Sequence, residues 1–128
     1  GVYISRDGAL VTAAVELTNS VVFIDTKTNE VAFRVKIKGE NPEHAVFSPD
    51  GKFVYVSAEE DDKLEIIDVA GRRLLTQLQV GTRPRGIAFT PDGAKAARFE
   101  IFGCRADDDP VTFFDRPSEQ FVAYRAAD

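Results

Sequence analysis

The sequence contains no methionine and no tryptophan, and it has a single cysteine and a single histidine among its 128 residues. The lone Cys104 excludes an intramolecular disulfide and any zinc site built on clustered cysteines. One histidine without a partner histidine or cysteine makes neither a catalytic triad nor an ordinary transition-metal site. Nucleophile elbows, phosphate loops and dinucleotide fingerprints are also missing. We therefore expect no catalytic residue, no metal site and no cofactor in this chain.

Long apolar runs and basic clusters are scarce as well. No apolar run approaches the roughly 20 residues that cross a bilayer, so we expect no membrane span. The 16 Lys and Arg against 21 Asp and Glu give a net charge of −5. The sequence also has no cluster of Lys and Arg of the kind that binds a phosphate backbone, which argues against nucleic acid as a partner. No secretory signal stands at the N-terminus. Because the chain contains no methionine and opens at Gly1 inside a strand candidate, we expect a piece of a longer protein or a processed product.

What the chain does contain is a repeat of about 42 residues. The turn Ser-Pro-Asp-Gly at residues 48–51 recurs as Thr-Pro-Asp-Gly at residues 90–93, and a looser copy, Ser-Arg-Asp-Gly, stands at residues 5–8. In such turns proline presets φ, the aspartate carboxylate accepts a nearby backbone N–H, and glycine adopts a positive φ. We interpret the turn aspartates as structural. An apolar segment ending in aspartate follows each turn, at residues 21–25, 64–68 and 111–115.

Each repeat holds four short strand candidates rich in Val, Ile, Phe and Tyr. In the second repeat we predict them at residues 44–48, 52–58, 63–69 and 73–80. Short strands joined by tight turns predict an antiparallel meander, and no long window shows helical periodicity. Tandem four-stranded meanders of this period are typical of β-propeller blades. We therefore predict an all-β fold, a partial β-propeller of three tandem four-stranded antiparallel meanders forming one domain, with blades at about residues 1–39, 40–81 and 82–128.

The repeat landmarks resemble a known family. The segments Asn-Ser-Val-Val-Phe-Ile-Asp-Thr-Lys-Thr-Asn at residues 19–29 and Gly-Thr-Arg-Pro-Arg-Gly-Ile-Ala-Phe-Thr-Pro-Asp-Gly at residues 81–93 resemble the YVTN-type β-propeller repeat. The second copy is the most similar, because Tyr-Val-Ser at residues 55–57 follows its turn. The first copy departs from the pattern, with Thr12 and Ala13 in place of Tyr-Val. The resemblance implies a ring that often has seven blades, a WD-like repeat architecture, and a location in the periplasm or at the cell surface.

Three blades cannot form a closed ring, because propellers close with about four to eight blades. Each blade is apolar on both faces and has to be covered by a neighbour. The expected partners are therefore further blades of a longer chain or a second copy of this chain, which would give a six-bladed ring with two-fold symmetry. We expect the chain by itself to be oligomeric or poorly soluble.

The loops between the second and third strands and the connectors between blades share one end of a meander, opposite the aspartate turns. The resemblance implies that ligands bind at this connector face, around the central channel. Our candidates for ligand binding are Glu43, His44, Arg83 and Arg85. His44 is a general base or metal ligand or, as we prefer, a polar residue at a strand end. The two arginines hold an anionic ligand or, as we prefer, bridge adjacent blades to carboxylates such as Glu43.

Two acidic loops, at residues 59–62 and 107–109, occupy equivalent positions in successive blades. A calcium site and a solvated acidic rim are both compatible with them, and we prefer the rim, since neither loop has the spacing of a calcium loop. Taken with the resemblance, the preferred function is a non-catalytic binding or scaffold module with a protein or small-molecule ligand. The alternative is a fragment of a propeller enzyme, a quinoprotein dehydrogenase subunit or a lactonase, whose catalytic residues lie mostly on missing blades.

Overall fold

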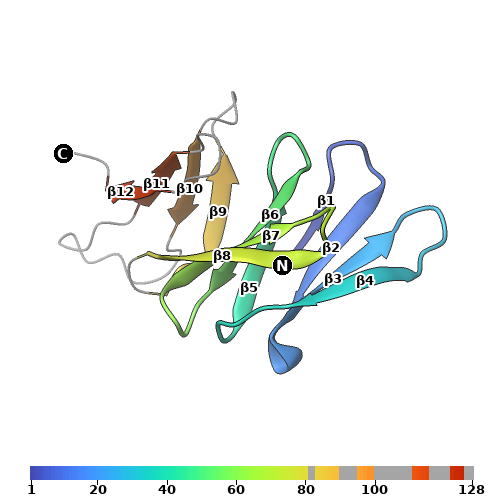
Figure 1. Cartoon of the computed structure of the whole chain (residues 1–128), viewed down its shortest axis with the longest axis horizontal. Coiled ribbons are helices and arrows are strands. Elements are labelled where there is room, and N and C mark those ends of the chain that lie inside the picture. The colour runs from blue at the N-terminus through green and yellow to red at the C-terminus, as the bar shows by residue number, and fades with distance from the viewer. Residues whose placement is uncertain (81–82, 90–94, 100–110, 116–121, 126–128) are drawn as a thin grey trace.

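The computed structural model describes residues 1–80 and 83–89 in full, and it describes the backbone of three further strands at residues 95–99, 111–115 and 122–125. The strands form three antiparallel sheets of four strands each, in which every strand pairs with its neighbours in sequence. Figure 1 shows the three sheets side by side, and we call them blades 1, 2 and 3. The predicted all-β class and the partial propeller architecture are confirmed.

Blade 1 consists of β1 (Val2–Ile4), β2 (Leu10–Val15), β3 (Ser20–Asp25) and β4 (Val31–Lys36), with one turn of 3-10 helix, η1 (Glu16–Thr18), between β2 and β3. Blade 2 consists of β5 (Pro42–Phe47), β6 (Phe53–Ala58), β7 (Lys63–Asp68) and β8 (Arg73–Gln79). Blade 3 consists of β9 (Gly86–Phe89), β10 (Lys95–Phe99), β11 (Val111–Asp115) and β12 (Val122–Arg125). The four strands predicted for the second repeat all exist, and their bounds differ from the prediction by no more than two residues.

The aspartate turns are closed by their own side chains. Ser48 Oγ donates to Asp50 Oδ1 at 2.7 Å, and the backbone N–H of Lys52 donates to the same oxygen at 3.1 Å. The turn at residues 5–8 repeats this pattern, with Ser5 Oγ 2.6 Å from Asp7 Oδ1. Gly51 has φ 70°, the left-handed conformation that glycine adopts without strain. The structural interpretation of these aspartates is confirmed, while the copy at residues 90–93 lies outside the described residues.

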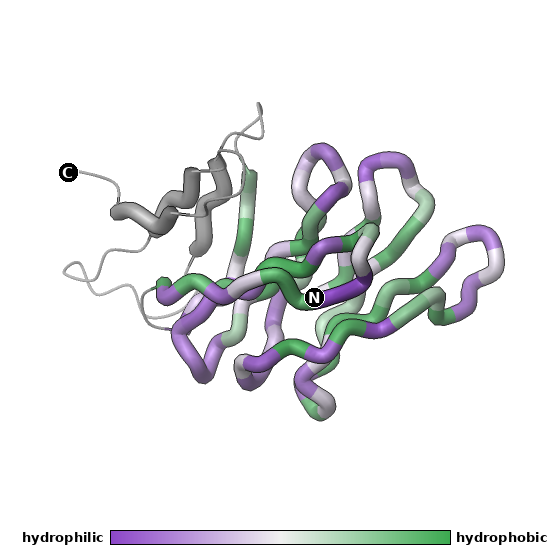
Figure 2. Tube along the Cα trace, in the orientation of Figure 1, coloured by the Kyte–Doolittle hydropathy of each residue, from purple (hydrophilic) through white to green (hydrophobic). Residues whose placement is uncertain are grey.

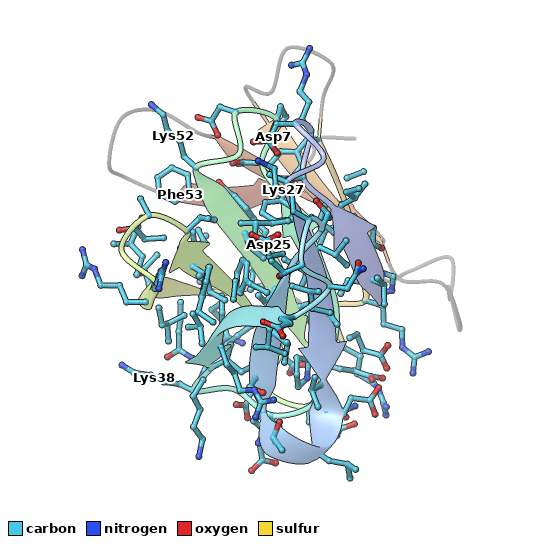
Figure 3. All side chains as sticks on the ribbon, turned by 90° about the vertical axis from the view of Figure 1, so that its right-hand side faces the viewer. Asp7, Asp25, Lys27, Lys38, Lys52 and Phe53 are labelled. Atoms are coloured by element: carbon cyan, nitrogen blue, oxygen red, sulfur yellow. The ribbon has the colours of Figure 1, made fainter. Side chains whose placement is uncertain are left out.

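The turns and the connectors lie at opposite ends of the blades. Thr26, in the turn between β3 and β4, donates its hydroxyl to Gly8 O at 2.6 Å, which joins the two turns of blade 1. Figure 3 shows Asp7 and Lys52 at this turn end and Lys38, in the connector between blades 1 and 2, at the other. The predicted separation of turn end and connector face is therefore confirmed.

Blade 2 is apolar on both of its faces. Successive residues of a strand point to opposite sides of the sheet, and β6 uses both sides. Val54 and Val56 pack in a buried cluster with Phe23 of blade 1, whereas Tyr55 packs in a second cluster with Ile87 of blade 3. Figure 2 shows hydrophobic residues along the strands and hydrophilic ones at the turns. Blade 2 is thus held between its neighbours by apolar burial on each face.

Blade 1 has an apolar outer face, on the side away from blade 2. Val2 and Ile4 of β1 are 69% and 61% exposed there. Residues paired directly across strands share a face of the sheet, and Val2 pairs with Ala13, which pairs in turn with Val22. The outer face of blade 1 is therefore apolar, as is its inner face, which packs against blade 2.

Candidate functional site

The connector face is built from two junctions of the same design. Junction 1 is the passage from blade 1 to blade 2 around Asn41, and junction 2 is the passage from blade 2 to blade 3 around Arg83. In junction 1 the backbone N–H of Asn41 donates to Asn19 Oδ1 at 3.2 Å. In junction 2 the backbone N–H of Arg83 donates to Asp62 Oδ1 at 2.8 Å. Each acceptor lies in the loop before the third strand of the preceding blade, so both junctions are fixed in the same way.

All four of these residues have left-handed backbone conformations. The φ angles are 45° for Asn19, 58° for Asn41, 55° for Asp62 and 49° for Arg83. Asparagine and aspartate tolerate this region, whereas arginine adopts it rarely. The left-handed backbone of Arg83 is therefore held by the contacts that the residue makes with blade 2.

Arg83 and Arg85 both bind one oxygen of Glu59, in the loop that follows β6. Arg83 donates to Glu59 Oε1 from Nε at 2.9 Å and from Nη2 at 2.6 Å. Arg85 donates to the same oxygen from Nε at 3.0 Å and from Nη2 at 2.6 Å. The other oxygen, Oε2, accepts from Asn41 Nδ2 at 3.1 Å. We call Asn41, Glu43, Glu59, Arg83 and Arg85 the Glu59 cluster.

The cluster has a buried anion beneath partly exposed cations. The side chain of Glu59 is only 1% exposed, whereas those of Arg83 and Arg85 are 54% and 32% exposed. Burial raises the pKa of Glu59, but the hydrogen bonds from Arg85 and Arg83 outweigh it and lower the pKa to about 2. Burial also raises the pKa of Glu43, and the hydrogen bond and negative charge of Glu59 raise it further. Two adjacent carboxyl groups thus have pKa values shifted in opposite directions.

The structure brings three of the four candidate ligand-binding residues, Glu43, Arg83 and Arg85, into one cluster. The bridging role preferred for the arginines is confirmed, because both connect blade 2 to the connector of blade 3. The carboxylate that they bridge to is Glu59, however, and the charge of Glu43 acts on Arg85 without a hydrogen bond between them in the described contacts. Binding of a ligand by these residues stays a prediction.

The solvated acidic rim predicted for residues 59–62 is wrong for Glu59. A carboxylate is buried when enough donors satisfy its oxygens, and two guanidinium groups and one carboxamide do so here. Glu60 matches the expectation better, since its side chain is 50% exposed and forms an ion pair with Arg83, at 3.1 Å. The second acidic loop, at residues 107–109, and Cys104 lie outside the described residues.

His44 lies beside the cluster, at the interface between blades 1 and 2. Its backbone N–H donates to Ser57 Oγ at 3.2 Å, and its ring Nδ1 is hydrogen-bonded to the hydroxyl of Tyr3 in β1. Burial lowers the pKa of His44, and the positive charges of the Gly1 amino group and Arg85 lower it further. The Tyr3 hydroxyl and the His44 Nδ1 share one hydrogen bond, so His44 serves to join two blades. This agrees with the structural role that we preferred for it.

Chemically, the Glu59 cluster offers positive hydrogen-bond donors at the connector face. In the described part of the chain, the Nη1 groups of Arg83 and Arg85 have no hydrogen-bond acceptor, and their side chains reach solvent. Guanidinium donors in this setting suit carboxylate or phosphate oxygens. Within the described ranges, no group of three or more His, Cys, Asp and Glu side chains is placed to hold a metal ion. In the same ranges, no helix is long and apolar enough to cross a membrane.

Comparisons with known proteins agree with the architecture. A family model described as a lactonase with a 7-bladed beta-propeller matches residues 1–79, more than half of the chain. No curated protein matches the sequence. Hydrazine synthase of Kuenenia stuttgartiensis is similar in structure, with a TM-score of 0.85 and 26% identity over 99% of this chain and 35% of that chain.

Two further solved structures share the fold at lower identity. A putative 6-phosphogluconolactonase from Bacteroides fragilis has a TM-score of 0.78 and 19% identity, over 96% of this chain and 36% of that chain. The beta-propeller domain of Cps50 (Swd1) from Myceliophteria thermophila has a TM-score of 0.77 and 18% identity, over 97% of this chain and 38% of that chain. This chain therefore spans little more than a third of each of the three structures.

Proposed function

The chain belongs to the lactonase family of seven-bladed β-propellers, and on this premise we propose that it is part of a non-catalytic propeller module that binds an anionic ligand at its connector face. The single observation that supports this best is the arrangement of Arg83 and Arg85 over the buried carboxylate of Glu59. Glu59 fixes one edge of each guanidinium, so the remaining donors are held in place before a ligand arrives.

The type of repeat and the way in which the ring is completed are part of the same proposal. We assign the blades to the YVTN-like type of propeller repeat, and further blades or a second copy of the chain complete the ring. The apolar outer face of blade 1, with Val2 and Ile4 exposed, supports a need for such a covering partner. A location in the periplasm or at the cell surface remains a prediction from the resemblance, and fractionation of cells that produce the full-length protein tests it.

Binding is tested on the full-length protein by calorimetry with gluconate, which carries one carboxylate, and with uncharged glucose. We expect gluconate to bind and glucose not to bind. Replacing Arg85 by Gln removes the charge and should weaken gluconate binding by about tenfold or more, the usual effect of losing a charged hydrogen bond. Lys38→Gln is the matched control, because Lys38 is an exposed cation on the same face, and it should change affinity by less than about twofold. Equal affinity for gluconate and glucose would overturn the proposal.

Lactone hydrolysis is a second candidate function, and the match to a lactonase family model favours it. Within the described residues, a carboxyl with a raised pKa, Glu43, and the guanidinium of Arg85 resemble an acid and an anion-stabilising group. The test is the rate of 6-phosphogluconolactone opening by the full-length protein, measured against the spontaneous rate. A rate above the background that disappears in Glu43→Gln would favour the enzyme over the binding module, and a rate equal to the background would exclude it.

A further inference from the structure

Arg83 and Arg85 bind Glu59 through the same edge of their guanidinium groups. A guanidinium holds a carboxylate either at its side edge, formed by Nε and Nη2, or at its end edge, formed by Nη1 and Nη2. Both arginines use the side edge for Glu59, at N···O distances from 2.6 to 3.0 Å. The end edge of each arginine is therefore the part that a second anion can use.

The two end edges differ in what they contact. The Nη2 group of Arg83 also donates to Glu60 Oε1, at 3.1 Å. Nη2 carries two N–H groups, and the one that is not directed at Glu59 lies on the end edge. In the part of the chain that the structure describes, no second carboxylate forms an ion pair with Arg85, whose side chain is 32% exposed. Glu60 thus occupies the end edge of Arg83, as the carboxylate of a ligand would, while the end edge of Arg85 is accessible.

The ion pair between Glu60 and Arg83 can be broken at small cost. The two side chains are 50% and 54% exposed, and ion pairs in such positions contribute little to stability. The repeat does not require a carboxylate here, because the residue one repeat before Glu60 is Leu17, whose side chain is fully exposed. Glu59, in contrast, is 1% exposed and accepts from both arginines. Of these two neighbouring carboxylates, Glu59 holds the arginines and Glu60 is free to move into solvent.

We propose that Glu60 is a built-in competitor for the carboxylate ligand of the connector face, and that it keeps Arg83 from the ligand until it is displaced. This inference rests on the anion site proposed above and names the residue that limits its affinity. With Glu60 in place, the ligand is held by the end edge of Arg85. When Glu60 moves into solvent, the end edge of Arg83 becomes a second point of attachment. Glu59 keeps the two edges adjacent, because the Nη2 groups of both arginines lie 2.6 Å from the same oxygen.

The experiment is a calorimetric titration of the full-length protein with gluconate, at neutral pH and constant ionic strength. Glu60→Gln should strengthen gluconate binding by about fivefold, the upper range for an exposed ion pair that no longer has to be broken. Glu60→Asp keeps the charge but shortens the side chain, which takes the carboxylate away from Arg83, and should strengthen binding by about threefold. Glu40→Gln is the matched control. It removes the same charge from an exposed residue of the connector between blades 1 and 2, and should change the affinity by less than about twofold.

The gain should also depend on Arg83. In an Arg83→Gln background, Glu60→Gln should change the gluconate affinity no more than Glu40→Gln does, because the edge for which Glu60 competes is gone. A gain from Glu60→Gln that persists without Arg83 would show that Glu60 acts only through its charge, and would overturn the proposal. Unchanged affinity in Glu60→Asp would overturn it in the same way.

Failure of this inference is distinguishable from failure of the anion site. Absence of gluconate binding in the unsubstituted protein and in Glu60→Gln alike would overturn the site itself. Gluconate binding that weakens in Arg85→Gln but is unchanged in Glu60→Gln would overturn only the role of Glu60. The two Glu60 variants alter an exposed residue of a loop, so they decide the question even where Arg83→Gln fails to fold.

Discussion

Junctions 1 and 2 share one backbone hydrogen bond to the loop of the preceding blade, and they differ in the further contacts that attach them. In junction 1 the backbone donates to a buried carboxylate, because the N–H groups of Lys38 and Gly39 bind Glu65 of β7 at 3.1 and 2.6 Å. In junction 2 the side chains of Arg83 and Arg85 bind the buried Glu59. A connector that is fixed through backbone N–H groups needs no charged side chain for these contacts. A connector that is fixed through arginines presents charged groups at the surface, so junction 2 is the one suited to ligand binding.

The close packing of junction 1 explains why it uses backbone donors. A Cβ atom on Gly39 would lie only 2.6 Å from the Cβ of Ala58, so the chain has room for no side chain there. The N–H of Gly39 then approaches Glu65, whose side chain is completely buried and also accepts from Gln77. The two junctions therefore respond differently to the loss of their carboxylates.

The largest expected effect is that of Glu65→Ala on junction 1. This substitution leaves the part-buried N–H of Lys38 and the buried N–H of Gly39 without their acceptor, and water cannot easily replace the carboxylate. We expect unfolding free energy to fall by about 3 kcal/mol, the usual range for buried unpaired groups plus a small cavity. Chemical denaturation measures it, with Glu30→Ala, at an exposed site, as the control. A loss no larger than that of the control would show that junction 1 is not fixed by Glu65.

Glu59→Ala should have a smaller effect on junction 2. The two arginines lose their common acceptor, but both already reach solvent and can be hydrated there. We expect a loss of about 2 kcal/mol, below the value for a fully buried ion pair. Glu16, one repeat earlier, is the matched control, since it is exposed, and Glu16→Ala should change stability by less than about 0.5 kcal/mol. Denaturation curves that coincide for Glu59→Ala and Glu16→Ala would show that Glu59 does not stabilise junction 2.

Acid should weaken junction 2 through Glu59. Its pKa is about 2 in the folded protein against an ordinary 4.5, so the folded state binds fewer protons between these values than the unfolded state does. The stabilisation is present above about pH 4.5 and is lost as the pH falls toward about 2, by roughly 1–2 kcal/mol. The difference in unfolding free energy between the unsubstituted protein and Glu59→Gln, followed against pH, isolates this contribution. Parallel pH curves would contradict it.

The smallest effect is expected from making junction 1 resemble junction 2. Glu43→Arg replaces a carboxyl near Glu16 and Glu59 by a guanidinium, which removes like-charge repulsion on both sides. We expect a gain of about 0.5–1 kcal/mol in stability, typical of a partly exposed ion pair. Thermal melting measures the gain, and Glu30→Arg at the exposed turn end is the control. A lower melting temperature than that of the control variant would contradict the prediction.

Much of the fold could be predicted from the sequence because its determinants are local. Ser48, Asp50 and Gly51 close their turn with bonds that span no more than five residues, so the pattern is legible wherever it recurs. The same holds for the alternating apolar residues of β6 and β7. The four-stranded antiparallel form of each blade and the assignment of the turns to one end follow from such local patterns alone.

The cluster itself was only partly predictable, because its contacts are distant in the sequence. Glu59 meets Asn41, 18 residues before it, and Arg85, 26 residues after it. An acidic run considered alone predicts exposure, and nothing within the run indicates that two arginines cover its first member. The repeat did contain a usable signal. Asn19 and Asp62 are one repeat apart in the sequence, and both are residue types that tolerate a positive φ. This pair marks the loop to which each connector is bound.

The alternation along β6 has a consequence for how such a protein can change in evolution. Val54 and Tyr55, adjacent in the chain, belong to different interfaces, so a substitution at one leaves the other interface intact. Deleting a single residue would exchange the two faces and place each side chain against the wrong neighbour. Within the paired strands such a shift is costly, whereas duplication or loss of a complete blade leaves every strand in register. The number of blades in the ring therefore changes by whole blades.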